Sequence, residues 1–257
     1  EILKLDKEAA GRHFVTSGER AGLVVSDARE GEDSVALSSG SRVGVYSPWR
    51  GSMDEGWMRY VLDTFGVEYR SVKNEMLRAG SIDDFLDVLV IPSISGGQLD
   101  DGRSPGSVAP RYTLGLDPEG AVAVEEFVRE GGTLITVGSS SQWAIDLFEL
   151  PLVDVTRGDD AGEFSCPGSL LRTIPEESPI TAGLPSSIGV FFSRSSAWRA
   201  MTAGEREEAR RGEAELSTLL SYAPSRLLLS GYCKEPETIE GRAAWVQASH
   251  GEGEVHL

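Results

Sequence analysis

Basic residues, histidine and cysteine are scarce in this sequence, and each scarcity excludes a class of protein. The 257 residues include 24 lysines and arginines against 41 acidic residues, which gives a formal net charge of −17. The resulting field repels phosphate backbones and anionic membranes, so nucleic-acid binding is not expected. The two cysteines, Cys166 and Cys233, are too few for a disulfide framework and too far apart in sequence for a zinc ribbon.

Long apolar runs are also missing. No run approaches the ~20 residues that span a bilayer, and the first residues lack a signal-peptide pattern, so membrane insertion is not expected. The sequence does not begin with methionine, and its last residues stop inside an apparent strand. Both features predict a chain cut from a longer polypeptide.

The hydrophobic fraction of 40% is that of a globular protein with a sizeable core. Residues 1–41 are expected to form an N-terminal appendage, a β hairpin followed by a Ser/Gly-rich linker. A regular alternation of strand and helix patterns begins at residue 42. A single α/β domain is therefore expected over residues 42–257.

The architecture follows from the order of these patterns. Strands are predicted at residues 42–46, 67–72, 87–92 and 133–137, and the last two have the apolar sequences of buried strands. Because strands and helices alternate, we expect a mainly parallel sheet with helices on both faces, a three-layer sandwich. Beyond residue 151 the pattern is rich in strands, and it ends in a predicted hairpin over residues 243–257.

The clearest helix is predicted between residues 52 and 66. Ser52 and Glu55 have capping-box spacing, so that Ser52 accepts from the amide of Glu55 while the Glu55 carboxylate reaches back. Gly66 is placed to end the helix in a left-handed conformation. The apolar side chains that recur at helical spacing are Trp57, Met58, Val61, Leu62 and Phe65.

Three polar segments are expected to meet at one edge of the sheet. They are residues 47–52, 93–97 and 138–143, and each follows a predicted strand. Ligands of parallel sheets bind beyond the carboxyl ends of the strands. The stretch 93–116 has no periodicity, which predicts a functional lid, a partner-binding insertion or a disordered segment.

The segment Y-S-P-W-R-G-S-M-D-E-G-W-M-R-Y-V-L-D-T-F-G-V-E-Y resembles one known family. The family is the glutamine amidotransferase-like domain that follows the peptidase module in a subgroup of bacterial zinc carboxypeptidase-like proteins. The other resembling segments are residues 87–97, 127–141, 164–171 and 243–257. The resemblance implies a flavodoxin-like sheet of the class I glutamine amidotransferase type, with extra β hairpins. It also implies a secreted or periplasmic location, and a peptidase module of the same polypeptide as partner.

The resemblance further implies that the catalytic zinc lies on the peptidase module, which this chain does not contain. Zinc carboxypeptidases bind their metal through a His-x-x-Glu pair and a distant His, leaving one position open for water. The three histidines here are His13, His250 and His256, and none begins a His-x-x-Glu. No metal site and no cofactor are expected in this chain.

An active class I amidotransferase has a Gly-x-Cys-x-Gly elbow and a His-x-Glu pair near its C-terminus. By this resemblance Ser140 stands where the nucleophilic Cys would be, and Gln142 replaces the second Gly. A triad of Ser140, His250 and Glu252 is one interpretation, with His250 as the base. Because a serine hydroxyl is protonated at neutral pH, the alternative is that Ser139, Ser140 or Ser141 caps the following helix. For His250 and Glu252 the alternative is a solvated hairpin turn.

Two further groups of candidates have similar alternatives. Gly96 and Gly97 resemble the glycine pair that supplies an oxyanion amide in active relatives, or they begin a flexible loop. Trp49 and Arg50 are candidates for ligand binding, because an indole beside a guanidinium stacks on rings and sugars. Otherwise, Trp49 fastens the loop and Trp57 belongs to the core. Ser139 and Ser141 complete the ligand-binding candidates.

These observations leave three hypotheses. The preferred one is a noncatalytic amidotransferase-like accessory domain that supports a zinc carboxypeptidase-like protein by docking, substrate presentation or ligand binding. The second is a serine-dependent amidohydrolase or esterase that uses Ser140 and His250. The third is a carbohydrate- or peptide-binding module, which requires a pocket around Trp49 and the stretch 93–116.

Overall fold

The computed structural model describes residues 40–257, and residues Ser41–Leu257 form one compact unit. The hairpin predicted within the first 39 residues lies outside the described part. From β1 onward, strands and helices alternate as the sequence predicts, and the α/β fold class is confirmed. No helix in the described part is long and apolar enough to cross a membrane.

The strands form one sheet that has a parallel half and an antiparallel half. The parallel half has the order β12-β4-β3-β1-β2. The inner strands β1 and β3 are buried over most of their length, whereas the edge strand β2 is exposed at Arg70 and Ser71. The uninterrupted apolar sequence of β3, Val-Leu-Val-Ile, reflects burial between two layers. The strands are β1 (Val43–Tyr46), β2 (Tyr69–Val72), β3 (Val88–Ile91), β4 (Thr133–Thr136) and β12 (Gly253–His256).

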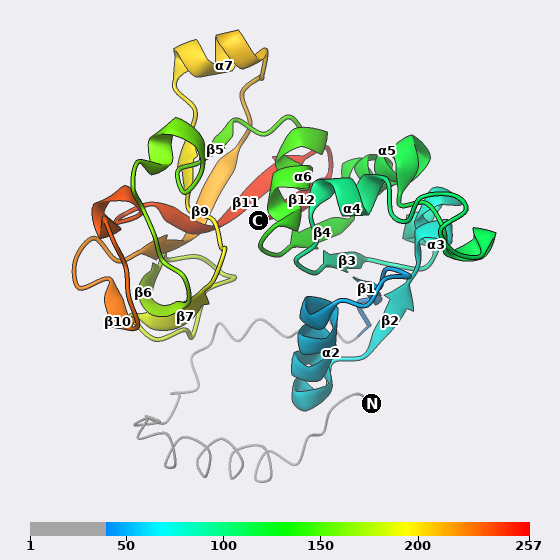
Figure 1. Cartoon of the computed structure of the whole chain (residues 1–257), viewed down its shortest axis with the longest axis horizontal. Coiled ribbons are helices and arrows are strands. Elements are labelled where there is room, and N and C mark those ends of the chain that lie inside the picture. Colours follow the sequence, from blue (N-terminus) through cyan, green and yellow to red (C-terminus); the bar gives the residue numbers. More distant parts are fainter. Residues whose placement is uncertain (1–39) are drawn as a thin grey trace. The chain divides into compact units, whose positions relative to one another are not determined.

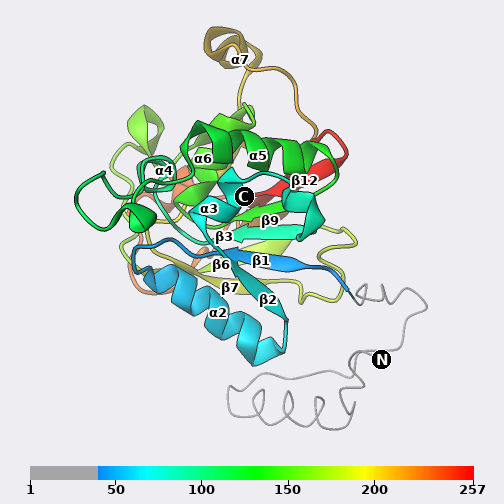
Figure 2. The same ribbon diagram turned by 90° about the vertical axis from the view of Figure 1, so that its right-hand side faces the viewer.

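The helices cover both faces of the parallel half, which confirms the sandwich. In Figure 2, α3 (Asn74–Arg78), α5 (Asp117–Arg129) and α6 (Ser140–Leu147) lie on one face, together with α4 (Gly96–Asp100). The helix α2 (Met53–Phe65) lies alone on the other face. The larger hydrophobic core therefore lies beneath α3, α5 and α6, around Leu89, Val124, Leu134 and Ile145.

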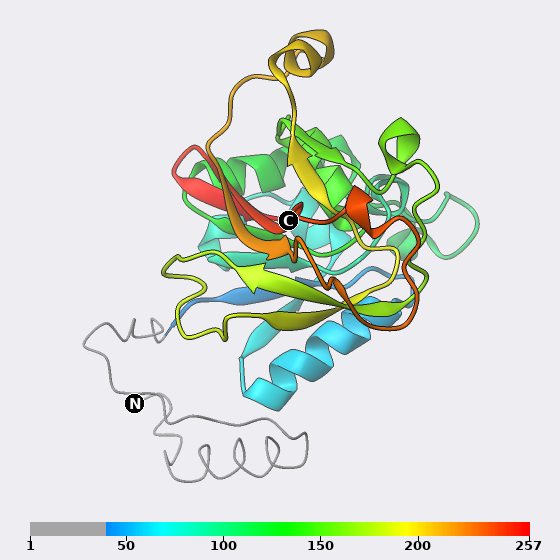
Figure 3. The same ribbon diagram turned by 90° about the vertical axis from the view of Figure 1, so that its left-hand side faces the viewer.

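The antiparallel half begins at the predicted C-terminal hairpin. β11 (Ala243–His250) pairs with β12, and Gly251 supplies the positive φ of the turn. β9, β6 and β10 continue the sheet beyond β11, β7 pairs with β6, and β5 pairs with β8 (Figures 1 and 3). Their bounds are β5 (Leu152–Asp154), β6 (Ser169–Pro175), β7 (Ile188–Phe192), β8 (Trp198–Ala200), β9 (Leu216–Tyr222) and β10 (Leu228–Ser230).

Short helical segments lie between the strands. The charged stretch 204–215 contributes to α7 (Ala203–Ala209), which buries none of its residues and projects from the sheet in Figure 1. The remaining turns are 3-10 helices: η1 (Ile82–Asp84), η2 (Pro110–Tyr112), η3 (Gly158–Ala161) and η4 (Pro236–Thr238). α4 and η2 fall in the stretch 93–116, for which the sequence shows no periodicity.

The helix α2 forms as predicted at both ends, but its apolar residues are placed differently. Ser52 accepts from the amide of Glu55 at 3.2 Å, and Gly66 ends the helix at φ 68. The Glu55 carboxylate pairs with Arg59 at 3.5 Å, whereas the sequence predicted a bond back to the cap. Trp57 is 65% exposed and Phe65 61% exposed, so the prediction that Trp57 belongs to the core is wrong.

The centre of the sheet is expected to dominate stability. Leu134 of β4 is fully buried, so Leu134→Ala should lower the free energy of unfolding by about 2–5 kcal/mol, because it leaves a cavity in close-packed surroundings. Leu170→Ala is the matched control, since Leu170 is 45% exposed and should cost less than about 1 kcal/mol. Urea denaturation of both variants measures the difference. Equal losses would contradict the placement of the core.

Candidate functional site

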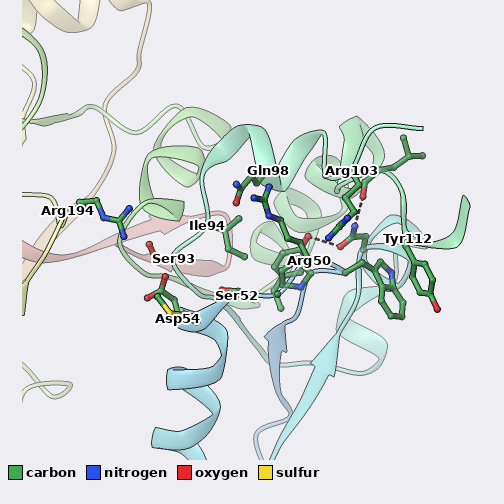
Figure 4. Close-up of a pocket in the computed structure, with 17 residues that line it drawn as sticks. Arg50, Ser52, Asp54, Ser93, Ile94, Gln98, Arg103, Tyr112 and Arg194 are labelled. Carbon is green, nitrogen blue, oxygen red and sulfur yellow. Dashed lines mark hydrogen bonds between the residues drawn. The ribbon is translucent and has the colours of Figure 1, made fainter. Parts of the chain in front are cut away.

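A cavity of about 420 Å³ lies at the carboxyl ends of β1 and β3, where ligands of parallel sheets bind (Figure 4). Its walls come from the β1–α2 connection, from the stretch 93–116, and from the loop after β7. The size suits a small ligand. The lining residues on which the site depends are Trp49, Arg50, Ser93, Arg103, Tyr112 and Arg194.

A chain of buried hydrogen bonds forms the floor of the cavity. Tyr46, the last residue of β1, donates its hydroxyl to Asn74 Oδ1 at 2.7 Å. Asn74 Nδ2 in turn donates to the carbonyl of Leu114 at 2.7 Å. Burial raises the pKa of Tyr46 above its ordinary value, so the hydroxyl stays protonated and remains a donor. These bonds join the first strand, α3 and the stretch 93–116.

Backbone hydrogen bonds join the two ends of the stretch 93–116. The amide of Leu114 donates to the carbonyl of Arg103 at 2.9 Å, and the amide of Leu116 donates to the carbonyl of Leu99 at 2.6 Å. A Cβ on Gly102 would lie 2.1 Å from the oxygen of Leu114, so only glycine fits where the two ends of the stretch approach each other. The cavity wall that carries Arg103 is therefore held in place before any ligand binds.

Trp49 lies in the cavity wall as a fixed aromatic group. Its Nε1 donates to a carboxylate oxygen of Glu75 at 3.0 Å, and its ring centroid lies 4.9 Å from that of Tyr112. The ammonium of Lys73 lies over the indole, 4.6 Å from its centroid. Trp49 and Arg50, which the sequence predicted as ligand-binding residues, therefore both line a cavity.

Ser140 does not have the exposure that a nucleophile at a strand-to-helix elbow requires. The elbow itself exists, with Gly138 at φ 60 between β4 and α6. Ser140 is fully buried, and its hydroxyl lies within 3.0 Å of the carbonyls of Ile91 and Val137 and of the amide of Val137. The hydroxyl fastens β4 to β3 beneath the surface, so it does not cap the amides of α6.

The structure does not bring Ser140, His250 and Glu252 together. β12 runs parallel to β4 with Glu254 beside Thr133, which places His250 and Glu252 at the amino end of β4. Ser140 lies past the carboxyl end, so the length of a four-residue strand, about 13 Å, separates it from His250. His250 Nε2 instead lies 2.9 Å from a carboxylate oxygen of Glu125. The proposed triad is therefore wrong, because the strand register separates its members.

The glycine and serine candidates also have structural roles. Gly96 and Gly97 are the first two residues of α4, and a Cβ on Gly96 would contact Trp143. The amide of Ser139 donates to Ser93 Oγ at 3.2 Å, and Ser141 is buried. Neither Ser139 nor Ser141 is among the residues that line the cavity.

Metal ligation finds no suitable set of residues in the described part. Within residues 40–257 no group of three or more His, Cys, Asp or Glu side chains could hold a metal ion. Cys166 and Cys233 are both free thiols, and Cys166 is buried in the smaller core. Burial and the nearby Cys166 raise the pKa of Cys233 to about 12, so this thiol stays protonated at neutral pH. The zinc of the resembling family does not fit these residues.

Comparisons with known proteins extend to the fold only. Neither a protein-family model nor a curated protein matches the sequence. Among solved structures, a protein described as ThuA-like from Bacteroides uniformis is 10% identical, with a TM-score of 0.45 over 84% of this chain and 80% of that chain. One described as a GMP synthase subunit from Thermoplasma acidophilum is 12% identical, with a TM-score of 0.46 over 84% and 82%.

A third similar structure is a β-galactosidase from Bacillus circulans, which is 13% identical with a TM-score of 0.42. In that case 84% of this chain corresponds to only 28% of the β-galactosidase. These likenesses concern the course of the chain. The fold class itself rests on the strand order and the placement of the helices.

Sequence reasoning missed most of the cavity residues. Arg103 and Tyr112 lie in the stretch 93–116, and Arg194 follows β7, far along the chain from Trp49. The composition of 93–116 predicted a functional lid, a partner-binding insertion or a disordered segment, but nothing in the pattern singled out Arg103. For Arg194 there was no signal, since its segment reaches the cavity only through the fold of the antiparallel half.

The buried hydroxyl of Ser140 predicts a structural role and no reaction with a probe for nucleophilic serines. Ser140→Ala should lower the free energy of unfolding by about 1 kcal/mol, because it removes hydrogen bonds inside the sheet. Ser139→Ala is the control and should be neutral, since the Ser139 side chain makes no cap hydrogen bond. A fluorophosphonate probe should leave the wild-type protein unlabelled. Labelling that disappears in Ser140→Ala would restore the hydrolase hypothesis.

Proposed function

We propose that this chain is a noncatalytic accessory domain that binds a small ligand in the cavity beside Trp49. The observation that carries the proposal is the cavity itself, which lies at the ligand-binding edge of an amidotransferase-like sheet. Its walls come from segments distant in sequence and are held by buried hydrogen bonds. A site fixed in this way loses little entropy on binding.

The placement of the predicted catalytic residues supports binding over catalysis. Ser140, at the position of the nucleophile, is buried, and His250, the base of the predicted triad, lies at the opposite edge of the sheet. The described lining of the cavity contains no histidine or cysteine. Peptides and carbohydrates remain the ligand classes proposed from the sequence.

Ligand binding is expected to depend on Trp49. A panel of short peptides and oligosaccharides, titrated calorimetrically, should give a ligand whose affinity falls about tenfold in Trp49→Ala, because the indole forms part of the wall. Trp57→Ala is the matched control, since Trp57 is exposed on α2 and does not line the cavity. Equal losses in the two variants would point to a different site.

Docking is a second role, and the exposed face of α2 favours it. No residue of α2 is buried, and one side of the helix presents Met53, Trp57, Tyr60, Val61 and Phe65 to solvent. A contiguous apolar surface of this kind marks an interaction site. We propose that it contacts the peptidase module of the same polypeptide, which the sequence resemblance implies. A His-x-x-Glu pair and a distant His elsewhere in the polypeptide would support this link.

The α2 face is expected to affect contacts between modules but not folding. In the full polypeptide, Trp57→Ser with Phe65→Ser should speed limited proteolysis between the modules. The free energy of unfolding of this domain should stay within about 0.5 kcal/mol, because the replaced side chains are exposed. Leu228→Ser with Leu229→Ser is the control, since these leucines are half-exposed on β10. Unchanged proteolysis in the α2 variant would exclude this docking surface.

A further inference from the structure

The cavity collects positive charge in a strongly acidic protein. Its lining includes Arg50, Arg103 and Arg194 but a single carboxylate, that of Asp54. The whole sequence has 41 acidic against 24 basic residues, so the composition alone would favour the opposite balance. Three separate segments each contribute one arginine, and the fold brings them to one place.

The arginines of the lining have no carboxylate partner among the described residues. Some arginines elsewhere in the described part do pair with acids, as in Arg42 with Asp87 and Arg211 with Asp146, both at 2.7 Å. Arg50 and Arg194 make no side-chain hydrogen bond or ion pair with the described residues. Arg103 Nε is buried and has no hydrogen-bond partner there either. The guanidinium charges of Arg50 and Arg194 are therefore not taken up by ion pairs with the described residues.

The charges are divided between two ends of the cavity. In Figure 4, Arg194 lies beside Asp54 and Ser93 at one end, whereas Arg50 and Arg103 lie toward Tyr112 at the other. Asp54 offsets the charge at the Arg194 end. The end with Arg50 and Arg103 therefore has two guanidinium groups and no lining carboxylate.

The aromatic rings of Trp49 and Tyr112 are already partly occupied by cations of the protein. Lys73 lies over the ring of Trp49, and the guanidinium carbon of Arg111 lies 4.4 Å from the centroid of Tyr112. Each ring thus already has a cation on one face. Charge, more than stacking, is the property by which this cavity selects a ligand.

We propose that the cavity binds a small ligand through an oxyanion group, a carboxylate or a phosphate, held between Arg50 and Arg103. Guanidinium groups donate hydrogen bonds in a planar fork that matches both oxyanions. This inference rests on the proposed ligand-binding function and adds the charge of the ligand to it.

Matched pairs of charged and neutral probes test the inference on the complete 257-residue chain. Benzoate against benzamide tests a carboxylate, and phenyl phosphate against benzyl alcohol tests a phosphate, each by isothermal titration at low and high salt. At least one anion should bind about tenfold more tightly than its neutral partner, and more weakly at high salt. The pair that shows the preference identifies which oxyanion the cavity takes.

Substitutions test whether the preference for anions depends on Arg50 and Arg103. Arg50→Gln and Arg103→Gln should each weaken the preferred anion about tenfold, whereas Arg226→Gln, an exposed arginine in a turn, should leave binding unchanged. Because Arg50 is exposed, Arg50→Gln keeps the test valid if Arg103→Gln folds poorly. Asp54→Asn should tighten anion binding, because it removes the one carboxylate of the lining. A merely structural role for Asp54 would not produce that gain.

The possible failures are distinct. If anions bind no better than neutral probes while Trp49-dependent binding of a neutral peptide or sugar is found, the oxyanion inference is wrong and the binding function stands. Wild-type affinity in Arg50→Gln and Arg103→Gln would likewise overturn the inference. If neither the neutral panel nor the anions bind, both the inference and the proposed binding function are wrong.

Discussion

The double pairing of β12 is the constraint on which the rest of this domain depends. β12 is antiparallel to β11 and parallel to β4, so it joins the two halves of the sheet into one. Its register fixes the hairpin turn, with His250 and Glu252, at the amino end of β4. The same pairing leaves the carboxyl ends of β1 and β3 open to α2 and to the stretch 93–116. Because strands pair along their whole length, no local change in a side chain can move His250 to the elbow.

The elbow and the cavity lie next to each other but differ in character. A Cβ on Gly138 would lie 2.8 Å from Ser93 Oγ, so the elbow packs against a residue that lines the cavity. The elbow hydroxyl is turned into the sheet, where it binds backbone groups. Exposed polar groups belong to the cavity, which has guanidinium groups in place of a nucleophile. In the proposed function this edge of the sheet serves recognition, and the arginines determine the charge of the ligand.

Much of the fold follows from local sequence, and particular residues show why. Ser52 and Gly66 specify the ends of α2 through hydrogen bonding and a left-handed φ, both of which are local properties. The apolar run of β3 predicts burial without knowledge of its neighbours. The exposure of Trp57 could not be predicted, because helical spacing shows which residues share a side but not whether another layer covers that side. Likewise Ser140 lies in an elbow-like pattern and His250 in a His-x-Glu pair, but the strand register determines how far apart the two residues are in space.

Local sequence was enough to predict the alternation of strands and helices, the caps, the C-terminal hairpin and the edge of the sheet at which the cavity lies. These features depend on residue periodicity and on backbone preferences that act over a few positions. Which charged groups meet at that edge depends on long-range folding. Arg50, Arg103 and Arg194 belong to segments whose separation in sequence carries no information about their distance in space. These arginines are brought together by the order of the strands, by the close backbone approach at Gly102 and by the hydrogen bonds of the buried Asn74 side chain. All three act between distant parts of the chain.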